Sequence, residues 1–392
     1  MLTSIALIFL LGLLLGSLFQ KLKLPNLLGM ILTGMLLSPY ALNLIDDTIL
    51  NISADLRQIA LVIILTRAGL SLNLSDLKAV GRPAVLMCFV PACFEMVGTV
   101  LLAPRLLGIS VLEAAIVGSV IAAVSPAVIV PRMIRLIDEG CGKEHSIPQL
   151  ILAGASVDDV FVIVMFTAFT SLASTGNISA VSFLQIPVSI LLGIALGFLV
   201  GLLLISFFKK FHMRDSVKIL IILSISFLLI ELQNRLEGIV PISGLLAIMS
   251  LGIIIKQKYQ VLAVRLSSKY NKLWVAAEIM LFVLVGATVD LKYAMTAGVA
   301  AIVLVCGALL FRMLGVLTCL IKTKLTKNER LFCMIAYTPK ATVQAAIGAV
   351  PLSMGLACGQ KVLTVAVLSI LITAPFGAIC VDKLYGKLLK KG

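Results

Sequence analysis

Two adjacent aspartates, Asp158 and Asp159, stand in the middle of an apolar stretch, GASVDDVFVIVMF. An ionised side chain at the centre of a bilayer costs roughly 2.5–3.5 kcal/mol on insertion scales. Buried charges in such stretches must therefore pair with one another or reach water. Three further ionisable residues lie near the middle of other long apolar stretches: Glu95, Arg312 and Lys340.

The five residues together suggest competition between a proton and a small cation. Three acids and two bases leave one net negative charge, which one proton or one monovalent cation can neutralise. Neighbouring residues of a helix project about 100° apart, so Asp158 and Asp159 cannot face one partner in the same way. We expect one to hold a basic side chain and the other to face an ion path. This geometry also argues against the facing carboxylate pair of an aspartic protease.

Arg312 is the expected partner of Glu95, of Asp158 or of both, because a guanidinium can bridge two carboxylates and stays charged. Lys340 follows a predicted break in a helix, where a positive charge offsets the negative end of the half-helix. A locking ion pair between Glu95 and Arg312, without a role in transport, remains an equal alternative.

Composition indicates how these residues are positioned. The chain has 392 residues, of which 61% are hydrophobic and 13% charged, and its mean hydropathy is +1.16. Apolar stretches of membrane-spanning length recur from end to end, without the alternation of a barrel strand. This pattern predicts an all-α polytopic membrane protein, and the first stretch is interpreted as a span, not as a signal peptide. Thirteen transmembrane helices are expected, at residues 2–19, 25–40, 56–72, 83–107, 111–135, 149–172, 183–208, 217–234, 241–256, 272–290, 295–321, 329–351 and 361–384.

The distribution of basic residues predicts the orientation. Of 32 Lys and Arg residues, 24 lie in alternate connections and in the C-terminal tail, five lie in the other connections, and three lie inside spans. Positive charge accumulates on the cytoplasmic side. We therefore expect a plasma (inner) membrane protein with its N-terminus outside and its C-terminus in the cytoplasm. The net charge of +14 is explained by this topology and by anionic lipid, so we expect no nucleic-acid partner.

Two predicted spans carry a proline in mid-span. One contains AAVSPAVIVP, with Pro126, and the other contains AYTPKATVQAAIGAVP, with Pro339. A proline in mid-helix removes a backbone hydrogen bond, which lipid tolerates only where protein lines a cavity. A matched pair of interrupted helices is the best sequence indication of a transporter site.

The spacing of these features predicts an internal repeat within a single transporter unit, residues 1–392. Pro126 and Pro339 are 213 positions apart, and Glu95 and Arg312 are 217 apart. We predict two inverted six-helix repeats whose broken helices cross, at residues 1–172 and 217–384. Residues 183–208 would form the linker helix, and an odd linker inverts the second repeat.

The motifs SPAVIVP, ASVDD and TPKATVQAA, in this order, resemble the monovalent cation:proton antiporter-2 family. RQIALVIILTRAGL and LFVLVGATVDL are similar to its NHA-type sodium/proton exchangers, and the resemblance covers essentially all spans. It implies an elevator-type antiporter, usually a homodimer, with no cofactor besides its transported ions. In such a protein a six-helix core carries the ion site past a dimerisation domain.

The resemblance also assigns roles. It implies that Asp159 binds Na⁺ or Li⁺ and exchanges it for H⁺, and that Asp158 assists and contacts a basic residue. Ser156 and Ser125 are candidate oxygen ligands. Many electrogenic relatives have a lysine where this chain has Arg312, and arginine does not release a proton at physiological pH. We therefore expect electroneutral exchange of one proton per cation.

Other functions remain as alternatives. Glu278 is a candidate cation attractor at the cytoplasmic mouth, although capping a helix or pairing with a loop lysine is the favoured explanation. K⁺/H⁺ antiport is the main alternative, and organic-anion:Na⁺ symport is a weaker one because no large basic pocket is evident. A channel is disfavoured by the lack of a repeated filter segment. An enzyme is disfavoured because the spans contain no catalytic constellation, and the eight cysteines form no CxxC pair.

Overall fold

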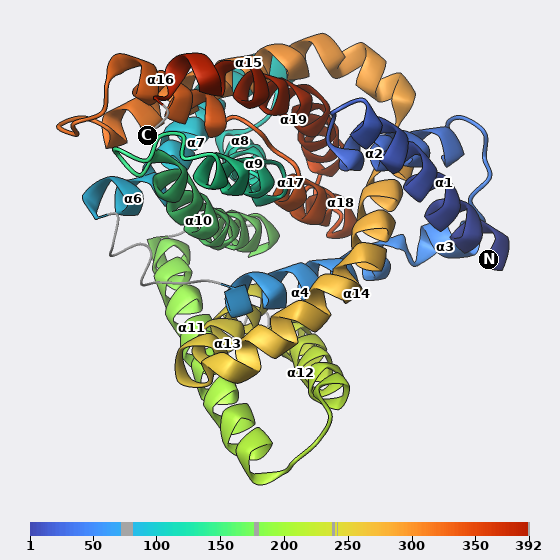
Figure 1. The fold of residues 1–392 in the computed structure, drawn as a ribbon. Coiled ribbons are helices and arrows are strands. Elements are labelled where there is room, and N and C mark those ends of the chain that lie inside the picture. The colour runs from blue at the N-terminus through green and yellow to red at the C-terminus, as the bar shows by residue number, and fades with distance from the viewer. Residues whose placement is uncertain (72–80, 176–179, 237–239, 241, 391–392) are drawn as a thin grey trace. The chain divides into compact units, whose positions relative to one another are not determined.

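The computed structural model describes residues 1–71, 81–175, 180–236, 240 and 242–390, and these residues form helices joined by short connections, with no strand among them (Figure 1). By contacts, the chain divides into two compact units. Unit 1 comprises residues 1–54, 74–162 and 279–392, and unit 2 comprises residues 55–73 and 163–278.

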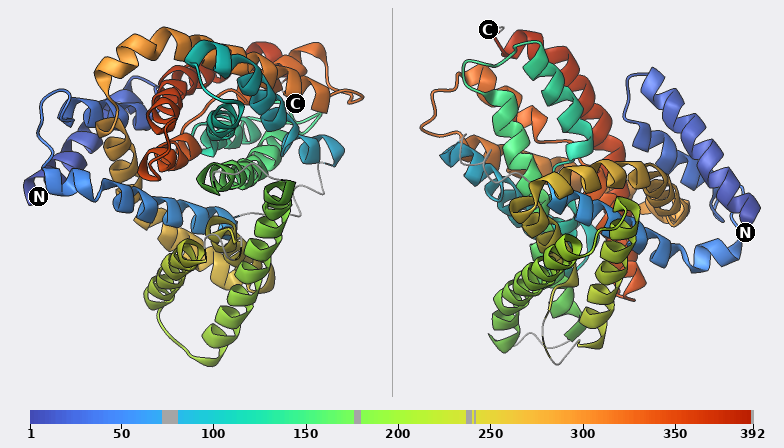
Figure 2. Two further views of the ribbon diagram at one scale, coloured as in Figure 1. Left: turned by 180° about the vertical axis from the view of Figure 1, so that it is seen from behind. Right: turned by 60° about the horizontal axis from the view of Figure 1, so that its bottom comes forward.

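Unit 1 contains most of the helices. Its helices are α1 (Leu2–Lys21), α2 (Asn26–Leu37), α3 (Asp47–Asn51), α6 (Arg82–Met87), α7 (Val90–Leu107), α8 (Val111–Ile121), α9 (Pro126–Asp138), α15 (Leu291–Cys319), α16 (Lys327–Ala336), α17 (Thr342–Ile347), α18 (Val350–Ser353) and α19 (Gly359–Leu388). α7 packs along α15, α1 lies beside α2, and α19 contacts α8, α15, α16 and α18 (Figures 1 and 2).

Unit 2 is built around a smaller group of helices. It contains α11 (Ala180–Lys210), α12 (Asp215–Arg235), α13 (Gly244–Lys258) and nearly all of α4 (Ser53–Ser71). It also contains the C-terminal part of α10 (Ile147–Thr175) and most of α14 (Gln260–Ala287). α13 packs against both α11 and α12. Gly197 of α11 lies against the backbone of Ala247 in α13, so a larger residue would hold these two helices apart.

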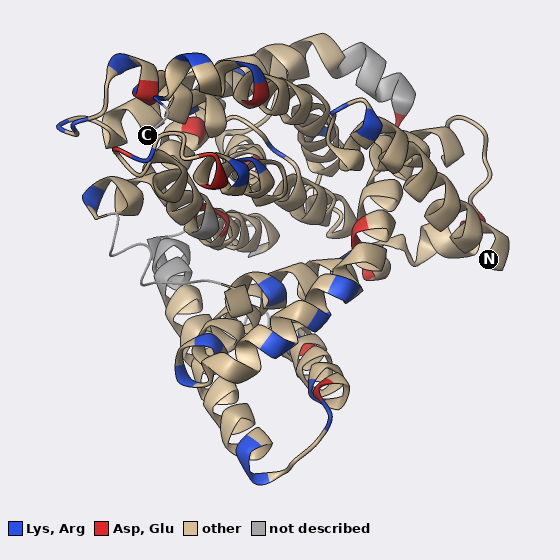
Figure 3. Cartoon of the chain, viewed as in Figure 1, with Lys and Arg blue, Asp and Glu red and all other residues tan. Residues whose placement is uncertain are grey.

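The membrane-protein class is confirmed by the length and composition of the helices. Within the described ranges, eight helical segments are long and apolar enough to cross a membrane: α1, α6–α7, α8–α9, α10, α11, α14, α15 and α19. Residues 2–20 of α1 and 188–208 of α11 contain no charged residue (Figure 3). Each of the other five predicted spans contains helix, in α2, α4, α12, α13 and α16–α18. The total of thirteen spans and the inverted repeat stay predictions.

Both proline-containing spans are interrupted. The first consists of α8 and α9, separated by residues 122–125, and the second consists of α16 and α17, separated by residues 337–341. Pro126 is the first residue of α9, a position where the missing N–H does no harm, and the preceding residue is extended. The proline therefore ends one half-helix and begins the next.

The first half-helix of each broken span begins with the same N-terminal capping motif. α8 starts with a capping box, in which the Ser110 hydroxyl accepts from the Glu113 N–H and Glu113 accepts from the Ser110 N–H. α16 starts with the same reciprocal pair, made by Thr326 and Glu329. Such a pair satisfies backbone donors at the helix start.

Candidate functional site

The interruptions of the two broken spans meet inside unit 1. The N–H of Ser125, in the first interruption, donates to the carbonyl of Pro339, in the second, at 2.8 Å. This hydrogen bond joins residues that are far apart in the sequence. Backbone N–H and carbonyl groups in the interruptions lack helical partners and need others where water is excluded. The hydrogen bond between the two interruptions supplies such a partner to one group of each.

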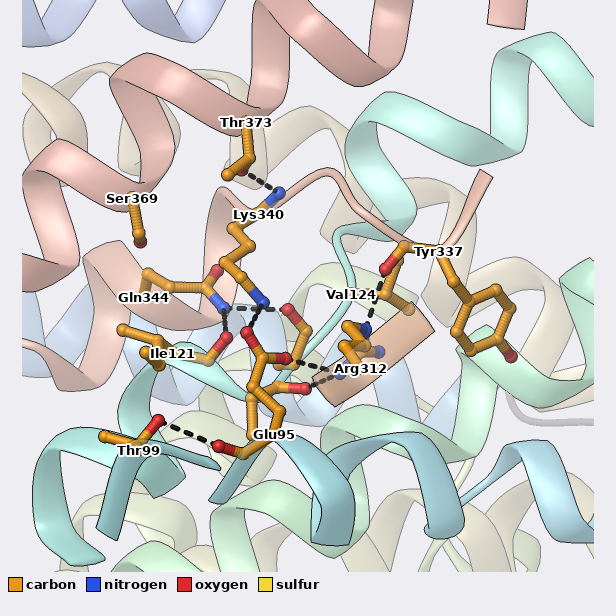
Figure 4. A network of polar contacts seen from close by, with 12 residues as sticks. Glu95, Thr99, Ile121, Val124, Arg312, Tyr337, Lys340, Gln344, Ser369 and Thr373 are labelled. Atoms are coloured by element: carbon orange, nitrogen blue, oxygen red, sulfur yellow. Dashed lines mark hydrogen bonds and ion pairs between the residues drawn. The ribbon is translucent and has the colours of Figure 1, made fainter. Parts of the chain in front are cut away.

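Two side chains satisfy the carbonyl groups at the end of α8. The amide Nε2 of Gln344 donates to the carbonyls of Ala123 at 2.8 Å and Ile121 at 3.4 Å (Figure 4). Arg312 donates to the carbonyl of Ala122, which lies between them. The Oε1 of Gln344 accepts from the N–H of Ala341 at 2.8 Å. Gln344 therefore ties the second interruption to the first.

Arg312, from α15, is the centre of the site. Its guanidinium pairs with Glu95 of α7 at 3.0 Å and with Asp158 of α10 at 2.9 Å, and all three side chains are fully buried. Its Nε donates to the carbonyl of Tyr337, in the second interruption, at 2.7 Å. A planar guanidinium has enough donors to hold two carboxylates and a carbonyl at once. The pairing anticipated for Arg312 with Glu95 or Asp158 is present with both.

Lys340 lies in the second interruption and extends toward Glu95 (Figure 4). Its Nζ is 2.6 Å from Glu95 Oε1, and both side chains are fully buried. Its backbone N–H donates to the Thr373 hydroxyl on α19 at 2.9 Å. Glu95 therefore sits between two bases, Lys340 and Arg312, and each of its carboxylate oxygens faces one of them.

The two adjacent aspartates differ in their surroundings. Asp158 Oδ2 accepts from the Val124 N–H at 2.8 Å in addition to Arg312, so this carboxylate is tied to the first interruption. Asp159 is partly exposed, and its Oδ1 is buried with no hydrogen-bond partner among the described residues. No described base lies within ion-pair distance of Asp159. Glu95 and Asp158 thus neutralise the two bases of the site, Arg312 and Lys340. The negative charge of Asp159 has no basic partner among the described residues.

The serine and glutamate candidates lie at different places in the fold. Ser125 is 1% exposed, and its hydroxyl has no partner within the described ranges. Ser156 is on α10, but its side chain lies outside the described part of the structure. Glu278 is a partly buried residue of α14 in unit 2, whereas the charge cluster belongs to unit 1. In unit 2, Arg67 of α4 lies over the Trp274 ring at 5.9 Å.

Several participants were not identified from the sequence, and they include Gln344, Thr373 and backbone groups such as the carbonyl of Tyr337. Gln344 stands in the motif that follows the second break, and a polar amide inside a buried half-helix was a usable signal. The carbonyl of Tyr337 and the hydroxyl of Thr373 offered no such signal. A backbone carbonyl is the same in every residue, and threonines in membrane helices commonly bond to their own backbone.

Comparisons with known proteins identify the family of this chain. A family model described as "Sodium/hydrogen exchanger, transmembrane" matches residues 5–382. The sodium/hydrogen exchanger 9B2 of Homo sapiens is 33% identical over 385 residues, which cover 94% of this chain and 70% of the relative. The sodium/hydrogen exchanger 9B1 of Homo sapiens is 32% identical over 383 residues, which cover 94% and 73% respectively.

A solved structure shares the fold. The sodium proton antiporter MjNhaP1 from Methanocaldococcus jannaschii, at pH 8, superimposes with a TM-score of 0.83 over 98% of both chains. Its sequence is 20% identical to this one. The similarity of fold therefore extends over nearly the whole of both chains.

Proposed function

The chain belongs to the sodium/hydrogen exchanger family, and from this premise we propose that it exchanges Na⁺ or Li⁺ for H⁺ at Asp159. Membership of the family makes the protein a multi-pass membrane transporter of cations and protons.

The observation that carries this proposal is the difference between the two aspartates. Asp158 pairs with Arg312 and accepts a hydrogen bond from the Val124 N–H, so its negative charge is already neutralised. Asp159 has a buried, unpartnered oxygen and no basic partner among the described residues. A carboxylate in that position is stabilised by a bound cation or by a proton, but not by both at once. Competition between the two ligands at one carboxylate is the basis of exchange.

The other polar atoms near the interruptions support a small oxygen-lined site. The hydroxyl of Ser125 is buried without a partner, and hydroxyl and carboxylate oxygens are suitable ligands for a hard monovalent cation. We propose that Asp159 and Asp158 supply the carboxylates and that Ser125 and Ser156 supply further oxygens.

The charge balance supports a one-for-one exchange. Arg312 stays protonated at physiological pH, and we propose that the pairing of Lys340 with Glu95 at 2.6 Å keeps this lysine charged throughout the cycle. Asp159 is then the one carboxylate of the cluster whose charge changes during the cycle. Replacing one Na⁺ by one H⁺ moves no net charge across the membrane, so we propose electroneutral exchange.

An elevator-type motion is consistent with the organisation of unit 1. Every charged group of the cluster belongs to this unit, and the two interruptions are joined by Gln344 and by the Ser125–Pro339 hydrogen bond. The site can therefore travel as one body. We propose that neutralisation of Asp159 by either ion permits this movement, and that the protein works as a homodimer in the plasma membrane, with its N-terminus outside.

Exchange in proteoliposomes tests the proposal. With an acidic interior and a pH-sensitive dye inside, external Na⁺ or Li⁺ is expected to drive alkalinisation of the lumen, because entering cation releases a proton from Asp159. K⁺ added in the same way distinguishes the alternative of K⁺/H⁺ exchange. Liposomes without protein are the control. Absence of alkalinisation with all three cations would refute the antiporter assignment.

The stoichiometry predicts independence from membrane potential. Clamping the proteoliposomes with valinomycin and K⁺ gradients at 0 or about −100 mV is expected to leave the initial Na⁺/H⁺ exchange rate unchanged. A cycle that moved one net charge would gain or lose about 2.3 kcal/mol per 100 mV. A rate that rises or falls several-fold with the clamped potential would contradict one proton per cation.

A further inference from the structure

Unit 2 contains a basic pocket where α11 ends and α12 begins. The pocket has a volume of about 640 Å³, within the range of sites that bind small ligands. The first part of α14 completes its wall, and blue segments gather on these elements in Figure 3. The charged residues that line it, apart from a histidine, are five bases and one acid: Lys209, Arg214, Lys218, Arg265, Lys269 and Asp215.

The single acid does not balance the bases. Asp215 is shared by Arg265, whose Nε is 3.2 Å from one carboxylate oxygen, and by Lys218, whose Nζ is 3.7 Å from the other. In the described part of the chain, no carboxylate lies within 4.0 Å of Lys209, Arg214 or Lys269. The pocket therefore keeps a large excess of positive charge.

Two further observations support an anion site at this pocket, where Lys218 is the buried base and the other four bases are exposed. Lys218 is only 5% exposed and packs its ammonium over the Phe208 ring at 5.7 Å. Its distance of 3.7 Å from Asp215 is longer than a hydrogen bond, so its donors remain available to a ligand. α12 begins at Asp215 without any side-chain cap, and uncapped N–H groups at a helix start attract anions.

We propose that this pocket binds a phosphate group, carried either by the headgroup of an anionic phospholipid or by a soluble phosphate. Phosphate matches the fork of an arginine, the charge of the lysines and the N–H groups at a helix start. Phe207, Phe211 and Val217 are exposed beside the basic residues and offer contact to an acyl chain. The pocket belongs to unit 2, whereas the charge cluster proposed for exchange belongs to unit 1.

Thermal unfolding of the full chain in neutral detergent tests this proposal. The probes are dioctanoyl phosphatidylglycerol and inorganic phosphate, with dioctanoyl phosphatidylcholine and an equal ionic strength of NaCl as controls for acyl chains and for screening. A ligand that binds the folded state raises Tm in a saturable way. We expect at least one of the two anionic probes to do so and both controls to have little effect.

A double variant and its matched control locate the binding. Arg214→Gln combined with Lys269→Gln removes two pocket charges that have no carboxylate partner. It is expected to raise the apparent Kd of the stabilising probe about tenfold or more, through loss of charge-assisted contacts. Lys210→Gln combined with Lys272→Gln removes the same charge from exposed positions of α11 and α14 outside the pocket, and should leave Kd nearly unchanged.

The outcomes distinguish a lipid headgroup from a soluble phosphate as the source of the bound phosphate group. Stabilisation by phosphatidylglycerol alone identifies a lipid headgroup. Stabilisation by inorganic phosphate, or its competition with the lipid, identifies a soluble phosphate as sufficient. The proposal is overturned if neither probe stabilises the natural protein, or if both double variants weaken binding equally.

Discussion

Replacement of Asp159 by asparagine is expected to reduce cation-driven proton exchange to the level of empty liposomes while leaving the protein folded. Asparagine has nearly the same shape as aspartate but cannot release a proton or neutralise a cation. The unpartnered Asp159 contributes no ion pair among the described residues. Its replacement should therefore leave Tm unchanged or raise it, because a carboxylate with a buried, unpartnered oxygen is removed. Proteoliposome exchange and thermal unfolding of the same preparation measure the two effects.

Asp158→Asn is the matched control, because it makes the same chemical change one residue away. Asp158 is paired with Arg312 at 2.9 Å and accepts from the Val124 N–H at 2.8 Å. Its replacement should lower Tm clearly, because it leaves the buried guanidinium with one carboxylate fewer. Normal exchange by Asp159→Asn, or a loss of Tm equal to that of Asp158→Asn, would show that the roles of the two aspartates are wrongly assigned.

Replacement of Arg312 by leucine is expected to destabilise the protein by about 3–5 kcal/mol, which is the usual effect of removing one partner from a buried ion pair. Both Glu95 and Asp158 would be left in a dry interior, with Lys340 as the one base of the cluster that remains. The carbonyls of Ala122 and Tyr337 would lose their donor as well. The free energy of unfolding in detergent is the quantity to measure.

Arg132→Leu makes the same substitution at a more exposed ion pair and serves as the control. Arg132 of α9 pairs with Asp382 of α19 at 3.1 Å, with side chains that are 17% and 29% exposed. Pairs that water reaches contribute about 0–1 kcal/mol, so the loss should be small. Arg312→Lys should fall between the two, because lysine keeps the charge but cannot span two carboxylates in one plane. Equal effects of Arg312→Leu and Arg132→Leu would contradict the central role of Arg312.

The class of the protein was predictable because lipid imposes simple rules on a sequence. A span needs about 20 apolar residues, and a buried charge is expensive enough to stand out from its surroundings. The five central charges were therefore visible without a structure, as were the breaks at Pro126 and Pro339, since proline interrupts a helix whatever surrounds it. The residue motifs indicated the family, and the family model confirms it.

The chemistry of the two aspartates did not decide which one was held by a base, and that expectation came from the family resemblance alone. Asp158 and Asp159 are chemically identical neighbours, and only the packing of α7, α10 and α15 places Arg312 against the first and leaves an oxygen of the second without a partner. The partner of Lys340 was likewise decided by the fold. The sequence places this lysine after a helix break, and the structure pairs it with Glu95. Partners in a buried network are chosen by distances between separate helices, and those distances exist only once the helices have packed.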